Sequence, residues 1–163
     1  MAVRRNRGNG TVLKLMLVAF VVIVIWMTWR NTASKLMGND DEKQARAAVE
    51  QFYAYEQAGD FGSSWTLFHP LMQERFEKAG YIQKRAQIML QDFGVKTFDV
   101  KIGPPKRLPQ WKMSREAQPI ANVYEIAVTE SFQSPYGNFD IHQACFAAKV
   151  DGKWRLLWSY QQE

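Results

Sequence analysis

An uncharged apolar run near the N-terminus constrains this chain more than any other feature of its sequence. Residues 15–29 carry no charged side chain, and extending the run back over Lys14 gives residues 11–29, 19 in all. A helix of that length rises roughly 28 Å, close to the ~30 Å hydrocarbon core of a bilayer. Trp26 and Trp29 stand at its far end, where indole rings favour the membrane interface. The sequence therefore predicts a transmembrane segment over residues 11–29.

Basic residues flank this segment unequally. Arg4, Arg5, Arg7 and Lys14 precede its apolar part, and Arg30 and Lys35 follow it. Because positive charge favours the cytoplasmic side, we expect a cytoplasmic basic tail at residues 1–10, a polar tether at 30–39 and an extracytoplasmic domain at 40–163. The stretch after the run lacks a clean small-residue cleavage site, which favours an uncleaved signal anchor in the cell membrane. A cleaved signal peptide and a buried core helix are the alternatives.

The net charge of +5 belongs to the membrane-proximal part of the chain. Six of the 21 basic residues precede Asn39 with no acidic residue among them, so residues 39–163 have a net charge of −1. A nucleic-acid-binding domain needs a basic face, so no nucleic-acid partner is expected. The outer part is long enough for one domain with its own core.

The period of the apolar residues divides the outer domain into helices followed by strands. Helical spacing is seen in three regions: from Asn39 or Asp40 to Gly59, from Phe61 to about Lys78 with a break at Pro70, and from Tyr81 to Phe93. Strands are predicted at 95–102, 120–132, 139–150 and 153–160. The prolines of residues 103–118 indicate an irregular connection or a twisted edge. The sequence thus predicts an α+β fold: about three helices packed on a curved antiparallel sheet of three to four strands.

Asp151-Gly152 is a two-residue hairpin signal that sets the register of the last two strands. It places Lys149 opposite Trp154, Ala147 opposite Leu156, Cys145 opposite Trp158 and Gln143 opposite Tyr160. We expect this apolar face to pack on the helices. The other face is too apolar to be fully solvated, so a helix pair or a partner chain should cover part of it.

This order of elements carries a resemblance to a known family. With Gly59-Asp60-Phe61 after the first helix, the turn 134–139 and the ending 151–158, residues 41–161 resemble the nuclear-transport-factor-two-like (cystatin-like cone) superfamily. More narrowly, they resemble the N-terminal non-catalytic domain of class B penicillin-binding proteins of Gram-positive bacteria. The sequence has no Ser-x-x-Lys, Ser-x-Asn or Lys-Thr-Gly, so no penicillin-binding activity is expected. The superfamily also supplies an assembly component of type IV secretion systems.

Some members of the superfamily are cavity enzymes of the isomerase or dehydratase type, which need converging polar groups. The parts available here are His69, His142, Asp99, Tyr124 and Tyr160. We expect His69 to cap a helix, His142 and Asp99 to be exposed, and Tyr124 to lie in the core. Cys145 is expected to be an inert buried residue. No metal or cofactor signature is present, so the prediction is a protein without enzymatic activity and without cofactors.

The most distinctive surface segment is basic and rich in proline. It contains Lys101, Lys106, Arg107, Lys112 and Arg115, with Trp111 among them as the expected exposed anchor residue. We expect it to bind a protein partner or an anionic surface polymer, the alternative being a solvated loop. Association of copies through the sheet is a further expectation. The function predicted from the sequence is therefore a membrane-anchored, extracytoplasmic binding module, with a secretion or conjugation assembly component and a small cavity enzyme as alternatives.

Overall fold

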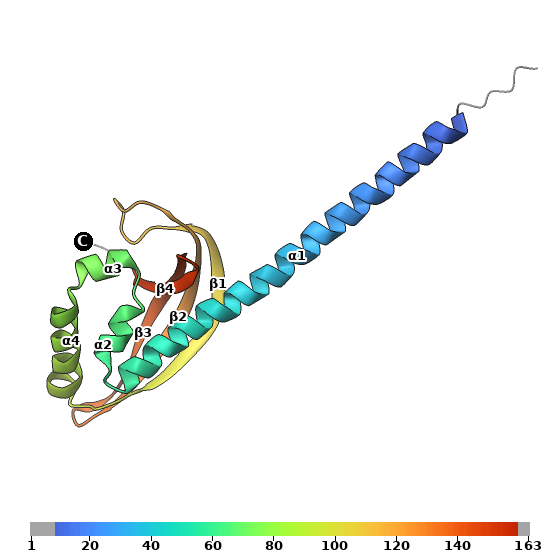
Figure 1. Ribbon diagram of the computed structural model, residues 1–163. Helices are drawn as coiled ribbons and strands as arrows, with labels where there is room; N and C mark the ends of the chain where they lie inside the picture. The colour runs from blue at the N-terminus through green and yellow to red at the C-terminus, as the bar shows by residue number, and fades with distance from the viewer. Residues whose placement is uncertain (1–8, 160–163) are drawn as a thin grey trace, which may run out of the picture. The chain divides into compact units, whose positions relative to one another are not determined.

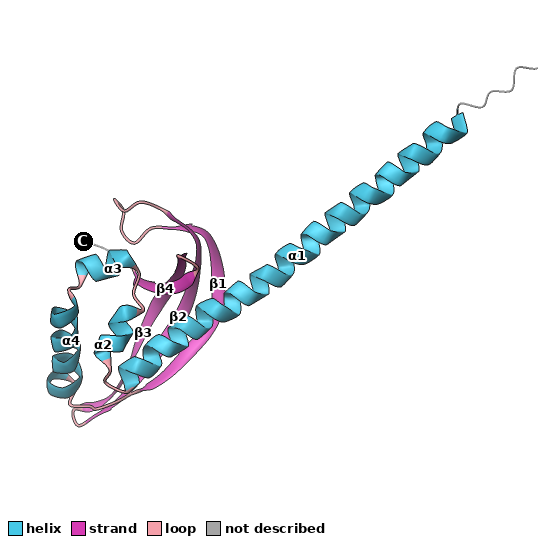
Figure 2. Ribbon diagram, in the orientation of Figure 1, coloured by secondary structure: helices cyan, strands magenta, loops and turns pink. Residues whose placement is uncertain are grey.

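The computed structural model describes residues 9–159, with side chains described for 20–27 and 40–159, and it has an α+β fold. The helices are α1 (Asn9–Gln57), α2 (Phe61–Thr66), α3 (Pro70–Arg75), α4 (Lys78–Gln87) and the π-helix η1 (Ile88–Asp92). The strands are β1 (Asp99–Trp111), β2 (Ile120–Ser134), β3 (Gly137–Val150) and β4 (Lys153–Trp158). They form one antiparallel sheet in the order β1-β2-β3-β4 (Figures 1 and 2). The chain divides into two units, one ending at Asp40 and the other beginning at Asp41.

Helix α1 continues through the expected tether. It runs without interruption from Asn9 to Gln57, so the predicted helix start with a cap at Asn39 or Asp40 is wrong, and the segment predicted as a tether, residues 30–39, is helical. This stretch contains no proline, and a single glycine such as Gly38 lowers helix stability by only about 1 kcal/mol. Within the described residues, no helix offers an apolar stretch sufficient to traverse a bilayer. The side chains of 11–19 and 28–29, part of the predicted membrane segment, lie outside the described residues.

Helices α2 and α3 begin where the side chains of Asp60 and His69 accept hydrogen bonds from the first backbone N–H groups. Asp60 caps α2, since its Oδ1 accepts from the N–H of Ser63 at 3.0 Å. These bonds to Ser63 lower the pKa of the Asp60 carboxyl. Helix α4 begins at Lys78, three residues before the predicted start at Tyr81, and the helical stretch ends before Gly94, whose φ of +66° suits glycine.

The last hairpin has the predicted register. Cys145 pairs with Trp158, Ala147 with Leu156 and Lys149 with Trp154. Asp151 and Gly152 have φ values of 49° and 76°, as a two-residue turn of the I′ class requires. The pair involving Tyr160 lies outside the described residues.

Strand β1 corrects the prediction for the proline-rich segment. It extends to Trp111 and pairs with β2 over most of its length, with a register shift between Ile102 and Pro105. Of the two predicted alternatives, the twisted edge is therefore right and the irregular connection wrong for residues 103–111. Prolines fit here because β1 is the first strand of the sheet, where one side of the backbone has no neighbouring strand.

The opposite edge of the sheet is closed by the link between α2 and α3. The N–H of Leu156 donates to the carbonyl of Leu67 at 3.0 Å, and the N–H of His69 donates to the carbonyl of Leu156 at 2.9 Å. Phe68 forms an isolated parallel bridge with Leu156. The helical layer is therefore tied to the sheet through main-chain bonds as well as side chains.

The main core lies between the helices and the face of the sheet that carries Tyr124, Ile126 and Leu156, all buried. Phe52 of α1 and Phe68 contact Trp158 of β4, with ring centroids 6.1 and 5.0 Å apart. The packing of this face on the helices is as predicted.

The other face of the sheet is also buried at one end. Phe146, Ala148 and Leu157 lie there, and Trp111 stacks on Phe146 with ring centroids 4.2 Å apart. The covering group is thus the end of β1 from the same chain, where the sequence suggested a helix pair or a partner chain. Trp111 is half-buried, which corrects its prediction as an exposed anchor residue.

Candidate functional site

Seven polar side chains from five elements meet between the helices and the sheet. They are Tyr53 and Glu56 of α1, Ser64 of α2, Tyr81 and Arg85 of α4, Glu130 of β2 and Gln143 of β3. We call this set the interior polar cluster. Burying polar groups is unfavourable unless they are hydrogen-bonded, so their partners decide what the cluster can do.

Glu56 is the centre of the interior polar cluster, and its side chain is completely buried. Its Oε1 accepts hydrogen bonds from the hydroxyl of Ser64 and from Tyr81 Oη, the latter at 2.8 Å. Its Oε2 accepts from Arg85 Nε at 2.6 Å and also lies 2.6 Å from an Arg85 terminal nitrogen. Each carboxylate oxygen is therefore bonded to groups of the protein itself.

Arg85 connects Glu56 to the second acid of the cluster. One of its terminal nitrogens lies 4.0 Å from Glu130 Oε2. Gln143 Nε2 donates to Glu130 Oε1 at 2.7 Å and to Tyr53 Oη at 2.6 Å. Two carboxylates thus flank one guanidinium, and an amide joins the pair to a tyrosine.

The burial of these groups shifts their acidities. Burial raises the pKa of Glu130, Arg85 opposes the shift, and Glu56 adds to it. Burial raises the pKa of Tyr81, and the neighbouring Glu56 carboxylate raises it further. For Arg85, burial alone would lower the pKa, but Glu56, Tyr81 and Glu130 together raise it. The guanidinium therefore stays charged, and Glu130 holds its proton more tightly than an exposed acid does.

The arrangement brings an acid, Glu56, and a phenol, Tyr81, within hydrogen-bond reach, with a second acid, Glu130, on the other side of Arg85. A meeting of polar groups of this kind is what a cavity enzyme needs. A general base also needs a lone pair directed at a substrate, and both oxygens of Glu56 are already used. The cluster as it stands is suited to joining α1, α2, α4 and the sheet.

The catalytic candidates from the sequence are not brought together. His69 is half-buried at the start of α3, and its Nδ1 accepts from the N–H of Leu71 at 3.2 Å. It is a cap as predicted, although of the following helix. His142 is exposed and hydrogen-bonded to Thr129 Oγ1 at 2.9 Å, and Asp99 is exposed, both as predicted.

Two further candidates lie in the core, and one is not described. Tyr124 is buried, as predicted. Cys145 is also buried, and burial raises the pKa of its thiol to about 12, so it is not a nucleophile at neutral pH. Tyr160 lies outside the described residues.

The predicted partner-binding residues lie on β1 and in the connection that follows it. The side chains of Lys101, Lys106, Arg107, Lys112 and Arg115 are all exposed. Two of them have neighbours on β2: Lys106 Nζ lies 3.2 Å from Glu125 Oε2, and Arg107 donates to Asn122 Oδ1 at 2.9 Å. We call these five residues the basic edge.

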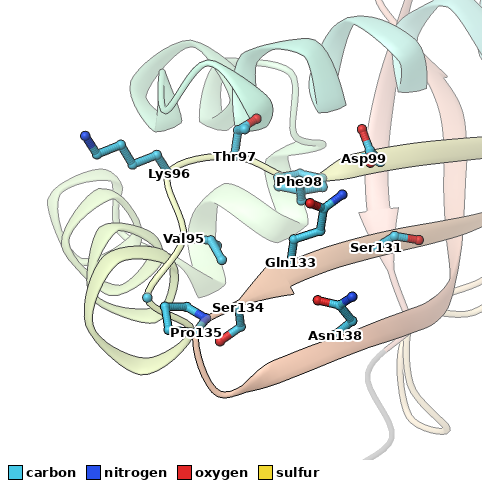
Figure 3. Close-up of a pocket in the computed structure, with 11 residues that line it drawn as sticks. Val95, Lys96, Thr97, Phe98, Asp99, Ser131, Gln133, Ser134, Pro135 and Asn138 are labelled. Carbon is cyan, nitrogen blue, oxygen red and sulfur yellow. The ribbon is translucent and has the colours of Figure 1, made fainter.

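A separate cleft lies at the end of the sheet where β1 begins and the β2–β3 turn closes (Figure 3). Its volume is about 620 Å³. The lining residues are Gly94, Val95, Lys96, Thr97, Phe98, Asp99, Ser131, Gln133, Ser134, Pro135 and Asn138. In Figure 3, Gln133 lies between Phe98 and Asn138, and Lys96 points away from the other side chains.

Sequence reasoning did not single out Glu56, Arg85 or Glu130. Glu130 alternates with Val128 and Phe132, and Glu56 follows Phe52 on one helix face. An acid at a position where the pattern requires an apolar residue is the signal that points to a buried ionic pair.

Models of known protein families and the sequences of curated proteins were compared with this chain, and none of them matches it.

Proposed function

We propose that this chain is a membrane-anchored, extracytoplasmic module that binds a partner and carries out no reaction of its own. We further propose that residues 40–163 belong to the nuclear-transport-factor-two-like superfamily, whose cone-shaped domains combine helices with a curved sheet in this order. The observation that carries the proposal is the exposure of eight consecutive apolar side chains of α1, Phe20–Met27.

These eight side chains extend around the whole helix. At 3.6 residues per turn they cover more than two turns, and their exposed fractions range from 42% for Val24 to 67% for Phe20. Amphipathic helices bury one stripe and expose the other, whereas a helix that is apolar on every face requires an apolar environment. A lipid bilayer around residues 11–29 supplies it, with the basic tail at residues 1–10 in the cytoplasm.

The proposal of a non-catalytic domain rests on the interior polar cluster. Its central carboxylate is enclosed and bonded to Ser64, Tyr81 and Arg85. Groups held in this way stabilise the packing of helices on the sheet. The second candidate function, a cavity enzyme, is favoured by the same meeting of Glu56 and Tyr81, and requires that this network open to admit a substrate.

The surface proposed to meet the partner is the basic edge. Its five positive charges stand on a part of the chain, residues 39–163, whose net charge is −1, so they are locally concentrated. Exposed lysine and arginine side chains attract acidic groups and accelerate association at low ionic strength. An acidic protein segment or an anionic surface polymer has the complementary charge.

Topology is tested with the full chain in cells. A reporter that is active only outside the cytoplasm, fused after Glu163, should be active, and the protein should remain in the membrane fraction after carbonate washing. As a control, replacing Val22, Ile23 and Ile25 by Lys should release the protein from that fraction, since each charge at the centre of a span costs about 2.5–3.5 kcal/mol. A cytoplasmic reporter or an unchanged distribution of the control contradicts the proposal.

Partner binding is tested with the full chain in detergent micelles and poly-L-glutamate as the probe. Reversing Lys106, Arg107 and Lys112 to Glu should weaken binding about tenfold at low salt, and the difference should shrink as salt rises. The matched control reverses Lys43, Lys84 and Lys153, three exposed lysines away from the basic edge, and changes the net charge equally. Equal weakening by both variants contradicts a role for the basic edge.

A further inference from the structure

The cleft beside the β2–β3 turn differs from the interior polar cluster in one chemical respect. The groups of the cluster are bonded to each other, whereas several polar side chains of the cleft are not. Among the described residues, the side chains of Asp99, Ser131, Gln133 and Asn138 have no hydrogen bond to another protein group. Gln133 and Asn138 are directly opposite each other on β2 and β3, and Ser131 is opposite Asp99 on β1.

These side chains therefore form two adjacent rows across three strands on one face of the sheet. Their amides and hydroxyl offer both donors and acceptors, and Asp99 adds an acceptor. Pockets for small ligands combine a few such polar groups with an apolar lining. The lining also includes the buried residues Val95 and Phe98, but the Phe98 ring stacks on Phe132 in the core, with centroids 5.1 Å apart, so exposed apolar surface must come from another residue.

An exposed aromatic ring stands at the edge of the same cleft. Tyr136 is 82% exposed at the tip of the β2–β3 turn. It lies beside the lining residue Gly94, at which an added Cβ would be 3.6 Å from the Tyr136 ring and 3.3 Å from Pro135. The turn is held to the start of the cleft because the hydroxyl of Ser134 donates to the carbonyl of Phe93 at 2.6 Å. The Tyr136 ring thus lies beside one lining residue of the cleft, Gly94, with most of its surface exposed.

We propose that this cleft binds an uncharged saccharide chain. Sugar hydroxyls both donate and accept, which matches the paired amides, and the apolar face of a sugar ring packs against an aromatic ring such as Tyr136. The charge of the lining excludes the main alternatives. Lys96 is the one cation among the lining residues and points away from them, so an anionic ligand lacks a partner, and Asp99 alone is too few ligands for a metal ion.

The inference goes beyond the function proposed above and uses different residues, so either can fail without the other. The test is calorimetric titration of the full chain, in micelles of a detergent without a sugar headgroup, with the β-1,4-linked tetramer of N-acetylglucosamine. Saturable binding should be insensitive to salt. Gln133→Leu and Asn138→Leu should each weaken it about fivefold, the effect of removing one hydrogen-bonding group, and Tyr136→Ala should weaken it by a similar factor.

The matched control is Gln110→Leu, which removes another exposed glutamine from β1 outside the cleft and should leave binding unchanged. All four substitutions affect exposed side chains, so the unfolding midpoint should stay close to that of the parent chain. The inference is overturned by the absence of saturation at millimolar tetrasaccharide. It is also overturned if Gln110→Leu weakens binding as much as Gln133→Leu. A third contrary result is that poly-L-glutamate displaces the tetrasaccharide from the protein.

Discussion

Replacing Arg85 by Met should destabilise the domain more than most single substitutions. The change removes the cation bonded to Glu56 and leaves that carboxylate completely buried with only the hydroxyls of Ser64 and Tyr81. Breaking a buried pair from one side costs about 3–5 kcal/mol, because an uncompensated charge remains in the interior. The Arg85 side chain is 20% exposed, so solvent reaches its outer end and the lower half of that range is expected. For a domain of this size, 3–4 kcal/mol corresponds to a fall of roughly 10–15 °C in Tm.

The assay is urea unfolding of the full chain in micelles, followed by tryptophan fluorescence. Trp158 reports directly on this region, because its ring centroid lies 6.5 Å from that of Tyr81. The control is the double variant Glu56→Gln with Arg85→Met. A neutral amide has no charge to compensate, and its oxygen can still accept from Tyr81, so the double variant should recover about half of the lost stability.

Two results would refute this reasoning. One is a loss below about 1 kcal/mol for Arg85→Met, the size of an exposed ion pair. The other is a double variant no more stable than the single one. That result would mean that the stability is lost because the packing of the arginine stem is removed, and not because the buried Glu56 carboxylate has lost its counter-charge.

Three other predictions concern the capping, packing and backbone of the domain. Burial lowers the pKa of His69, whose neutral Nδ1 caps α3, so the stability that His69 contributes is present above its unfolded pKa of about 6.5 and is lost as pH falls through the folded pKa. Because asparagine can cap but does not titrate, His69→Asn should reduce the difference between the urea midpoints at about pH 7.5 and pH 5. An unchanged difference would contradict the cap. Trp158→Ala should cost about 3–5 kcal/mol in the same assay, whereas Trp158→Phe should cost under about 1.5 kcal/mol because the buried indole N–H has no partner to lose. Gly94→Ala should lower the free energy of unfolding by about 1–2 kcal/mol, since φ at this position is +66°. An unchanged free energy of unfolding would show that the backbone at residue 94 adopts another conformation in the variant.

The parts of the fold that followed from sequence are those fixed by local chemistry. The Asp151-Gly152 turn requires two residues with positive φ, and its length alone determines which residues of β3 and β4 face each other. The buried Cys145 and exposed His142 followed from that register. Likewise, the change from helical to alternating apolar spacing after Gly94 predicted the α+β order of elements.

The errors arose where long-range contacts decide the structure. Prolines at 104, 105 and 109 suggested a segment outside the sheet, but pairing with β2 over most of β1 outweighs the N–H groups they lack. Trp111 was expected to be exposed because no local pattern accounts for it, and its partner Phe146 lies 35 residues away in the sequence. The interior polar cluster was missed for the same reason, since Glu56, Arg85 and Glu130 are far apart in the sequence and the Arg85 side chain meets both acids only in the folded domain.

The two borders of the sheet have a consequence for how copies of this protein behave when they are crowded. At high local concentration, copies of a protein meet often. An exposed edge strand can then pair with an edge strand of a neighbouring copy, and such pairing begins aggregation. Here β4 is already bonded to residues 67–69, and β1 presents three prolines and the charges of Lys101, Lys106 and Arg107. The prolines and charges of β1 and the main-chain bonds of Leu156 in β4 therefore disfavour growth of the sheet from one molecule to the next.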